Sequence, residues 1–337
     1  MTAQFWKQLP NGHVQCSLCR RSCVIPPSER GFCGVRANND DGVLHSLVVN
    51  GVGAMNLDPV EKKPLYHYLP GTRTLSFGTP GCNFACLFCQ NAALSHDARE
   101  LGHVRLQKIT PQALVEQARR NGAASLSFTY SEPTVFFELM AETADLALQA
   151  GFGTVLVSNG FQSPDSLKAL QGRIQAANID LKSFREEFYR KYCKAHLVPV
   201  LDNLKAMRAC GWWLEVTTLL IPGCNDGSDE LRELARFVAQ ELGQEVPWHI
   251  SRFRPTFRMK NVPPTPLADM ERAAQIGQEE GLRFVYLGNV AHHTLSDTFC
   301  PACGRKLLSR TGFSVAGLPF DGRCACGEEI PGVWSAA

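Results

Sequence analysis

Residues 76–91 (SFGTPGCNFACLFCQN) constrain this chain more than any other stretch. They place Cys82, Cys86 and Cys89 at C-x3-C-x2-C spacing. Thiolates are soft ligands that favour iron–sulfur clusters, zinc or Cu(I), and a cubane cluster normally takes a thiolate on each of its four irons. Three closely spaced cysteines therefore indicate a cluster with one iron left open, and an open metal position is where a substrate or cofactor binds.

This cysteine stretch directly follows a predicted strand. Residues 74–77 form a short apolar run, and Gly81 lets the backbone turn tightly before the first cysteine. A cysteine loop that leaves the C-terminal end of a first strand lies where a β/α barrel places its chemistry. The pattern therefore predicts a metal centre at the C-terminal end of a barrel strand.

The motif G-C-N-x-x-C-x-x-C, with the aromatic Phe88 before the third cysteine, resembles the signature of the radical S-adenosylmethionine (SAM) superfamily. The wider segment PLYHYLPGTRTLSFGTPGCNFACLFCQN resembles more closely the radical SAM member of the AmmeMemoRadiSam group, which is related to pyruvate formate-lyase activating enzymes. The resemblance implies that Cys82, Cys86 and Cys89 hold a [4Fe–4S] cluster and that SAM chelates its fourth iron, with Phe88 beside the cofactor. A structural zinc site is the alternative for these three cysteines.

Strand and helix signals alternate from residue 74 onward. Thr110 and Ser163 each precede a proline, which pairs a helix N-cap with proline at the first helical position, and Ser228, followed by two acids, opens a third helix. Strands that alternate with helices imply βαβ units and a parallel sheet. The superfamily resemblance implies an α/β fold, a partial (β/α)6 TIM-like barrel with a wide lateral opening. The candidate strands are residues 74–79, 125–130, 154–159, 176–182, 214–221, 247–253 and 283–288.

Prolines punctuate residues 59–70, which lead into the barrel. Within them, Tyr66, His67 and Tyr68 form either the wall of a substrate pocket or a packed loop. We expect a division of the chain into a cysteine-rich N-terminal segment with a metal site (1–60), the radical SAM barrel (61–290) and a zinc-ribbon-like tail (291–337).

The N-terminal segment carries Cys16, Cys19, Cys23 and Cys33 at C-x2-C-x3-C-x9-C spacing. Four thiolates so close in sequence are enough to close one tetrahedral metal site. Zinc and an auxiliary iron–sulfur cluster both accept four sulfurs, so the number of thiolates does not decide between them. Zinc is the interpretation we favour from the sequence, and free structural cysteines are the other alternative.

The tail carries Cys300, Cys303, Cys324 and Cys326. C-P-x-C-G followed about twenty residues later by C-x-C-G resembles the two knuckles of a zinc ribbon. The second knuckle is one residue shorter than the usual C-x-x-C, which leaves room for a distorted site. We predict a structural zinc that folds a short tail without a core of its own.

Polar residues follow several predicted strands at the end where a barrel collects its active site. Glu132 matches the last acid of a superfamily motif whose carboxylate accepts from the SAM amino group, although the glycine pair of that motif is missing here. A carboxylate suits an ammonium donor, and a charge at a helix start is the alternative. Ser158 and Asn159 could bond the ribose or the SAM carboxylate, as a similar motif does in activating enzymes, or form an ordinary turn.

Two later strands supply the remaining candidates for SAM binding. Asp180 and Lys182 share one face of a strand and resemble an activating-enzyme pair that contacts the polar groups of SAM. A barrel-core ion pair without function is the alternative. His249 resembles a SAM-contacting histidine of activating enzymes, and a satisfied barrel histidine is equally compatible with its position.

Composition bounds the location and the partners of this protein. The 14 cysteines fall mainly into metal-like groups, which in a reducing compartment indicates metal or catalysis rather than disulfides. Cys193, Cys210 and Cys224 are isolated, and we interpret each as a buried or half-buried thiol. A net charge of +2 gives no strong nucleic-acid signal, no apolar run approaches the ~20 residues of a membrane span, and the N-terminus lacks a signal-peptide core. We therefore expect a cytoplasmic protein without membrane association.

The function implied by the resemblance is a radical SAM oxidoreductase of the activating-enzyme kind. Its cluster would reductively cleave SAM to methionine and a 5′-deoxyadenosyl radical, which abstracts hydrogen from an unidentified substrate, with a protein or peptide as the candidate class. The resemblance also implies a one-electron donor such as a flavodoxin or ferredoxin, and Memo-type and Ammecr-type partners by family association. The alternative is a zinc-cluster binding module without redox chemistry; a third reading is a barrel that binds SAM but transfers methyl groups or serves as a scaffold.

Overall fold

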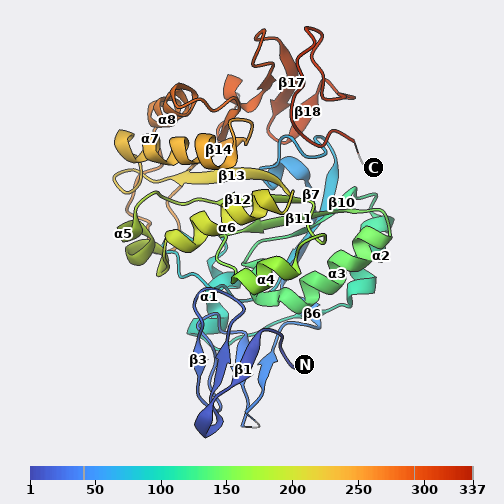
Figure 1. Ribbon diagram of the computed structural model, residues 1–337, viewed down its shortest axis with the longest axis vertical. Helices are drawn as coiled ribbons and strands as arrows, with labels where there is room; N and C mark the ends of the chain where they lie inside the picture. The colour runs from blue at the N-terminus through green and yellow to red at the C-terminus, as the bar shows by residue number, and fades with distance from the viewer. Residues whose placement is uncertain (41, 292, 336–337) are drawn as a thin grey trace.

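The computed structural model describes residues 1–40, 42–291 and 293–335. In Figure 1 the N-terminal segment lies at one end of the long axis, the main sheet with its helices in the middle, and the C-terminal tail at the other end. The N-terminal and C-terminal cysteine groups therefore lie on opposite sides of the barrel.

Eight strands form one open sheet in the order β15-β14-β13-β12-β11-β10-β8-β7. Seven of them are parallel, and β7 pairs antiparallel with β8 at one edge. The parallel strands are buried almost throughout, as apolar strands covered on both faces should be. All seven predicted strands are present, and the predicted α/β fold class is confirmed. The strands are β7 (Ala54–Pro59), β8 (Arg73–Gly78), β10 (Ser125–Phe128), β11 (Gly153–Ser158), β12 (Ala176–Asp180), β13 (Trp213–Leu220), β14 (Trp248–Arg252) and β15 (Val285–Gly288).

Helices connect the parallel strands and cover the outside of the sheet (Figure 1). The caps of two of them are those that the sequence predicts, because Thr110 and Ser163 accept hydrogen bonds from the amides of Ala113 and Ser166, 3.2 Å each. Ser228 is the first residue of α7. The helices are α1 (Ala92–Glu100), α2 (Pro111–Arg120), α3 (Phe137–Gln149), α4 (Pro164–Ala169), α5 (Glu186–Phe188), α6 (Val198–Ala209), α7 (Ser228–Phe237) and α8 (Leu267–Glu279), with π-helical turns η4 (Tyr189–Cys193) and η5 (Val238–Leu242) and 3-10 turns η1 (Pro10–Gly12), η2 (Val60–Lys62), η3 (Pro133–Phe136) and η6 (Thr294–Ser296). Among the described residues, none of these helices is long and apolar enough to cross a membrane.

The N-terminal segment forms small antiparallel units that pack on the barrel. Val14, Leu18 and Ile25 belong to the same hydrophobic core as Leu75 and Phe77 of β8. The segment that precedes the barrel forms short strands, and its last strand, β7, is part of the main sheet. The strands are β1 (Trp6–Gln8), β2 (Val14–Cys16), β3 (Val24–Ile25), β4 (Arg36–Asn38), β5 (Leu44–Ser46) and β6 (Gly51–Val52), which pairs with β9 (Gln107–Lys108).

The loop between β7 and β8 is packed rather than open. Tyr66, His67 and Tyr68 are all buried. The ring of His67 donates to the carbonyl oxygen of Pro331 at 2.7 Å and accepts from the hydroxyl of Tyr286 at 2.6 Å. Of the two readings of these aromatic residues, the structure shows the packed loop.

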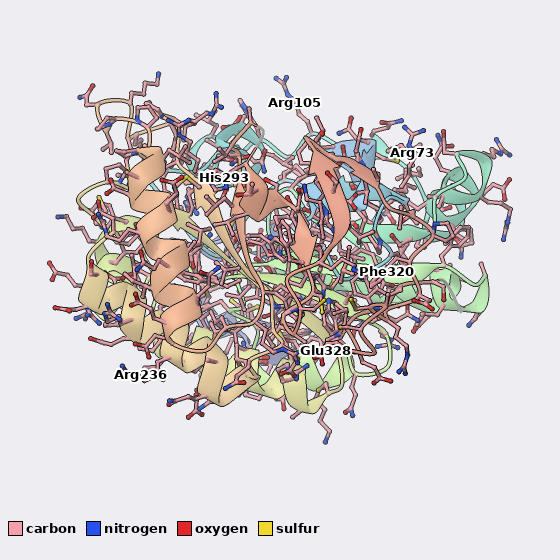
Figure 2. The ribbon with its side chains drawn as sticks, turned by 90° about the horizontal axis from the view of Figure 1, so that it is seen from above. Arg73, Arg105, Arg236, His293, Phe320 and Glu328 are labelled. Atoms are coloured by element: carbon pink, nitrogen blue, oxygen red, sulfur yellow. The ribbon has the colours of Figure 1, made fainter. Side chains whose placement is uncertain are left out.

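The C-terminal tail covers the side of the barrel on which the loop between β7 and β8 lies. Its strands are β16 (Thr298–Phe299), β17 (Lys306–Thr311) and β18 (Ser314–Ala316). Seen from the tail end in Figure 2, Phe320 and Glu328 lie within the outline of the barrel. Glu328 pairs with Arg283, which lies two residues before the start of β15. Because residues 66–69 enter β8 at its N-terminal end, the tail lies against the N-terminal ends of the parallel strands.

Candidate functional site

The cysteine loop begins where β8 ends and leads into α1. The amides of Ala85 and Leu87 donate to the carbonyl oxygens of Cys193 and Tyr192, 2.9 Å each. Those two acceptors lie in the π-helical turn η4, and such turns occur frequently at functional sites. The loop is thus held at the C-terminal end of its strand by a second segment from the other half of the barrel.

The three thiols of this loop lie in surroundings that favour their protonated form. Cys82 Sγ accepts from the amide of Phe84 at 3.3 Å and lies 3.9 Å from Asn159 Nδ2. Burial raises the pKa of Cys82 and of Cys89, and a hydrogen bond with the Cys193 thiol together with burial raises the pKa of Cys86. A buried thiol of this kind is inert as a free nucleophile and becomes a thiolate when a metal ion displaces its proton.

Glu132 lies beside Cys82 in a network of local donors. Its carboxylate accepts from the amide and the hydroxyl of Thr134 at 3.0 and 2.6 Å. It also accepts from Ser158 Oγ at 2.8 Å and from the amide of Asn159 at 2.9 Å. The structure therefore brings together three residues that the sequence predicts separately, from two different strand ends.

The charge of Glu132 has no counter-ion in the described part of the chain. Burial raises the pKa of Glu132, although its hydrogen bonds oppose the shift, and no Lys, Arg or His nitrogen of the described residues lies within 4.0 Å. A buried carboxylate normally has a cationic partner. Two neighbours also have unpartnered buried atoms among the described side chains, Asn83 Nδ2 and Gln162 Oε1. The site thus fits a ligand that carries an ammonium group and further polar atoms, as SAM does.

Asp180 is the last residue of β12, and Lys182 follows the strand near Phe88 of the cysteine loop. Lys182 Nζ lies 2.8 Å from Asp180 Oδ2 and 5.8 Å from the centroid of the Phe88 ring. Burial lowers the pKa of Lys182, but the charges of Asp180 and Cys86 outweigh it and raise that pKa well above its usual value. The side chain of Asp180 is 38% exposed, so its carboxylate remains open to a ligand.

His249 lies in a different part of the barrel. Its Nε2 donates to Glu215 Oε2 at 2.6 Å, and its ring packs edge-on against Tyr66 at 4.8 Å. Glu215 also accepts from the amides of Tyr66 and His67, which precede β8. This network therefore lies at the N-terminal end of the strands, away from the cysteine loop. The contact between His249 and SAM stays a prediction, and this placement does not support it. The alternative, a histidine whose hydrogen bond is made within the barrel, describes His249 better.

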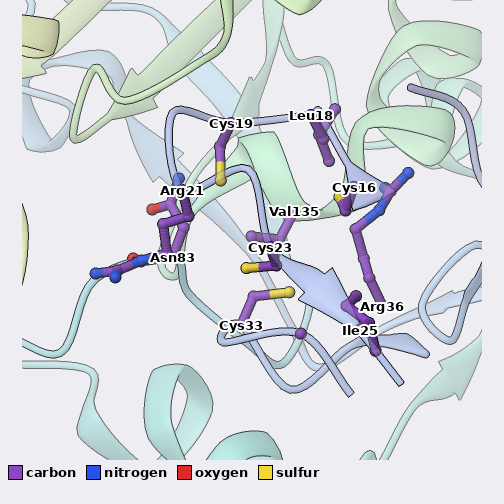
Figure 3. A pocket seen from close by; sticks show the side chains of 11 residues that line it. Cys16, Leu18, Cys19, Arg21, Cys23, Ile25, Cys33, Arg36, Asn83 and Val135 are labelled. Atoms are coloured by element: carbon purple, nitrogen blue, oxygen red, sulfur yellow. The ribbon is translucent and has the colours of Figure 1, made fainter. Parts of the chain in front are cut away.

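The four N-terminal cysteines surround one cavity next to the cysteine loop (Figure 3). The space not filled by protein atoms is about 330 Å³, part of it open to solvent, and Asn83 of the loop lines it too. Figure 3 shows these four cysteines together with the other side chains that line the cavity. Burial raises the pKa of Cys33 to about 11 and also raises that of Cys19. Cys16 and Cys33 are buried, Cys19 and Cys23 are half-buried, and all four line this one cavity.

The tail cysteines lie close together in spite of the short second knuckle. The sulfurs of Cys300 and Cys326 are 3.6 Å apart, and those of Cys303 and Cys324 are 3.7 Å apart. All four lie within 4.8 Å of one another. A tetrahedral ion with metal–sulfur bonds of ~2.3 Å separates its ligands by about 3.8 Å. The set therefore fits a single metal ion.

The contacts of several residues at the site were not predicted from the sequence. Arg21 donates to the carbonyl oxygens of Asn83 and Lys194, and Gln162 Nε2 donates to Ser158 Oγ at 3.1 Å. Cys193, which we interpreted as an isolated thiol, is buried next to Cys86. Arg21 and Cys193 reach the site from distant segments, so no sequence spacing points to them. Gln162 lies only four residues from Ser158, and Asn83 directly follows Cys82, so these two were local signals.

Comparisons with known proteins agree with this geometry. Residues 77–238 match the radical SAM superfamily. An uncharacterized protein of Methanocaldococcus jannaschii, MJ0808, is 41% identical over 332 residues, which cover 97% of this chain and 98% of the relative. The isethionate sulfite-lyase activating enzyme of Oleidesulfovibrio alaskensis is 25% identical over 245 residues, which cover 69% of this chain and 75% of that enzyme.

Two solved structures share the fold. Streptococcus suis SuiB bound to its precursor peptide SuiA has a TM-score of 0.52 at 16% identity, covering 69% of this chain and 52% of SuiB. A radical SAM methyltransferase from Sphaerobacter thermophilus has a TM-score of 0.50 at 14% identity, covering 71% of each chain. The chain belongs to the radical SAM superfamily, whose cofactors are a [4Fe–4S] cluster and SAM. It is an enzyme of radical chemistry, so a binding module without redox chemistry does not describe it.

Proposed function

We propose that this protein is a radical SAM enzyme of the activating-enzyme kind and a member of the AmmeMemoRadiSam group. Cys82, Cys86 and Cys89 would hold the [4Fe–4S] cluster, which supplies the electron for SAM cleavage. The 5′-deoxyadenosyl radical so formed would abstract hydrogen from a protein or peptide substrate. The other residues of this proposal bind and orient SAM: Phe88, Glu132, Ser158, Asn159, Asp180 and Lys182.

One observation carries this proposal. The buried carboxylate of Glu132, which has no cationic partner among the described residues, is linked to Cys82 through Asn159. The backbone amide of Asn159 donates to Glu132, and its side-chain nitrogen lies 3.9 Å from Cys82 Sγ. An ammonium group held by Glu132 would therefore lie next to the metal ligands. A charged hydrogen bond is strong in such a dry site.

The substrate class rests on the relatives of this chain. One of them is named as an activating enzyme for isethionate sulfite-lyase, and that name supports a protein substrate here. A flavodoxin or ferredoxin would supply single electrons, and Memo-type and Ammecr-type proteins are the partners that the group suggests. We also propose that the tail ion is a structural zinc and that the chain divides at residues 60 and 290, with β7 adjoining the barrel.

The Cys82→Ala variant tests the cluster assignment. After anaerobic reconstitution and reduction, wild-type protein should convert SAM to 5′-deoxyadenosine, and the variant should form none because one of three ligands is missing. Chromatography of the products measures this, and circular dichroism establishes that the variant is folded. Cys210→Ala, at a half-buried thiol in the turn that ends α6, is the matched control and should leave product formation intact. Native-rate product from Cys82→Ala would show that the assignment is wrong.

A further inference from the structure

The sulfur spacing of the N-terminal cysteines differs from that of the tail set. Among the described residues, groups of three or more His, Cys, Asp or Glu side chains can be sought whose ligand atoms all lie within 4.8 Å of one another. The four tail cysteines form such a group. Cys16, Cys19, Cys23 and Cys33 line one cavity without meeting that distance. A single ion needs its four sulfurs about 3.8 Å apart. In a cubane each thiolate is bonded to a different iron, so the thiolates stand further apart.

The radical SAM loop provides an internal comparison. Cys82, Cys86 and Cys89 are the cluster ligands proposed above, and their sulfurs are also outside the 4.8 Å grouping. Neither the N-terminal set nor the cluster loop therefore has the tight sulfur spacing of the tail. The number of thiolates did not decide between zinc and an iron–sulfur cluster at this site. The spacing of the sulfurs favours the iron–sulfur cluster.

The charges around the cavity suit a negatively charged cluster. Arg36 lines it but is paired with Glu138 at 3.0 Å. Among the described residues, the guanidinium of Arg21 bonds only backbone carbonyl oxygens, and it lies 3.5 Å from the centroid of the Phe32 ring. Its positive charge is thus free to offset charge on a metal–thiolate group.

The two cysteine sites adjoin each other. Asn83 lines the N-terminal cavity and directly follows Cys82. Gly81, on the other side of Cys82, has φ +100°, and a Cβ there would come within 2.8 Å of the carbonyl oxygen of Cys33. The backbone of one site thus packs on the backbone of the other, and Arg21 bridges them through the Asn83 carbonyl.

We infer that Cys16, Cys19, Cys23 and Cys33 hold a second iron–sulfur cluster and that Arg21 stabilises its reduced state. The cluster takes up one electron from a donor of the flavodoxin or ferredoxin class, which is oxidised by one electron, and no bond forms or breaks. Arg21 is a positioning residue whose charge favours the more negative, reduced form.

The test uses the full chain with its radical SAM ligands removed, so that it is independent of the function proposed above. The variant Cys82→Ala, Cys86→Ala, Cys89→Ala is reconstituted anaerobically with iron and sulfide, and its metal, sulfide and electron paramagnetic resonance spectrum are measured. We expect about four irons and four sulfides, with a reduced-cluster signal that disappears when Cys19→Ala and Cys23→Ala are added.

Retention of zinc at the N-terminal cysteines with no iron would overturn the inference, and so would the absence of any metal there. If the triple variant does not fold, the wild type decides instead. It should bind about eight irons, and the Cys19→Ala, Cys23→Ala variant about four. Equal iron in these two proteins would also overturn the inference.

The substitution Arg21→Gln in the triple variant tests whether Arg21 stabilises the reduced state of the second cluster. Removing the positive charge should make the midpoint potential of the remaining cluster more negative, as spectroscopic redox titration measures. Arg20→Gln is the matched control, because Arg20 lies next to Arg21 in the chain, is 31% exposed and is 3.8 Å from Asp202. A merely structural role of Arg21 would leave the potential unchanged, and that result would overturn its assignment.

Discussion

At the scale of single residues, Glu132 shows that a helix-start carboxylate and a ligand acceptor need not be alternatives. It accepts from the amide of Thr134 at the start of η3, which is the local role that its position in the sequence allows. The same carboxylate is buried, joins Ser158 and Asn159, and has no cationic partner among the described residues. Only the second set of contacts makes it a candidate for SAM binding.

We expect Glu132→Ala to weaken SAM binding by roughly 10- to 100-fold, since loss of a charged hydrogen-bond partner costs about 1.5–3 kcal/mol. Iron content should not change because Glu132 is not a ligand. Isothermal titration under anaerobic conditions measures the affinity. Glu142→Gln, an exposed carboxylate on α3, is the control. An affinity of Glu132→Ala within twofold of wild type would mean that Glu132 serves only the helix start.

The pH dependence of SAM affinity follows from the same carboxylate. Burial raises the pKa of Glu132 above its usual value, so this group takes up a proton at a higher pH than an exposed glutamate does. The protonated form cannot pair with an ammonium group, and SAM affinity should therefore fall as the pH falls through the raised pKa. In Glu132→Gln the same titration series should be flat over that interval; a parallel decline in both proteins would contradict this explanation.

At the scale of elements, the N-terminal segment is fastened to the barrel by a buried ion pair between β4 and α3. Arg36 donates two hydrogen bonds to Glu138, at 3.2 and 3.0 Å, and both side chains are almost completely buried. The amide of Gln4 also donates to Glu138 at 2.8 Å. Removing one partner of such a pair leaves an uncompensated buried charge.

Arg36→Met should lower the free energy of unfolding by about 3–5 kcal/mol, because Glu138 is then left charged in an apolar setting. Denaturation by urea measures the change. The double variant Arg36→Met, Glu138→Gln removes both charges, keeps an acceptor for the Gln4 amide, and should recover most of the loss. A double variant no more stable than the single one would locate the effect in packing around Arg36 instead of in the charge.

At the scale of the whole molecule, the barrel is covered at both ends by a cysteine-rich unit. The N-terminal segment covers the C-terminal strand ends, where Leu18 and Arg20 bond residues 161–163 beyond β11. The tail covers the opposite ends, where Val333 exchanges two hydrogen bonds of 2.7 Å with His67 and Leu69. The first unit is therefore part of the site, and the second supports the base of the barrel.

Removal of the tail ligands should separate stability from cofactor binding. The variant Cys303→Ala, Cys326→Ala should lose its metal and lower the thermal midpoint by about 5–10 °C, because Tyr66, Phe284 and Tyr286 pack on the tail. SAM affinity should stay within twofold of wild type. Metal analysis, calorimetry and titration check these outcomes, and an unchanged midpoint would show that the tail folds without its ion.

Much of the fold could be predicted from the sequence because its signals are local. The seven parallel strands are short apolar runs bounded by turns, and Thr110 and Ser163 announce their helices by capping chemistry. Spacing alone grouped the tail cysteines, which the structure places within 4.8 Å of one another. His249 shows the limit of this approach, because the sequence pattern does not show which end of the barrel a strand residue lies near. Only the contact with its partner Glu215 reveals that His249 lies toward the N-terminal ends of the strands.

What the sequence determined by itself is the chemistry of each segment: three cysteine groups, an alternating α/β pattern, and the radical SAM signature around Cys82. What the tertiary structure decided is which segments meet. Arg21, Asn83 and Glu132 come from three distant parts of the chain, and their contacts depend on loops that close only when the barrel forms. The physical reason is that backbone hydrogen bonding and apolar periodicity act over a few residues, whereas a buried charge or a shared cavity is defined by the whole fold.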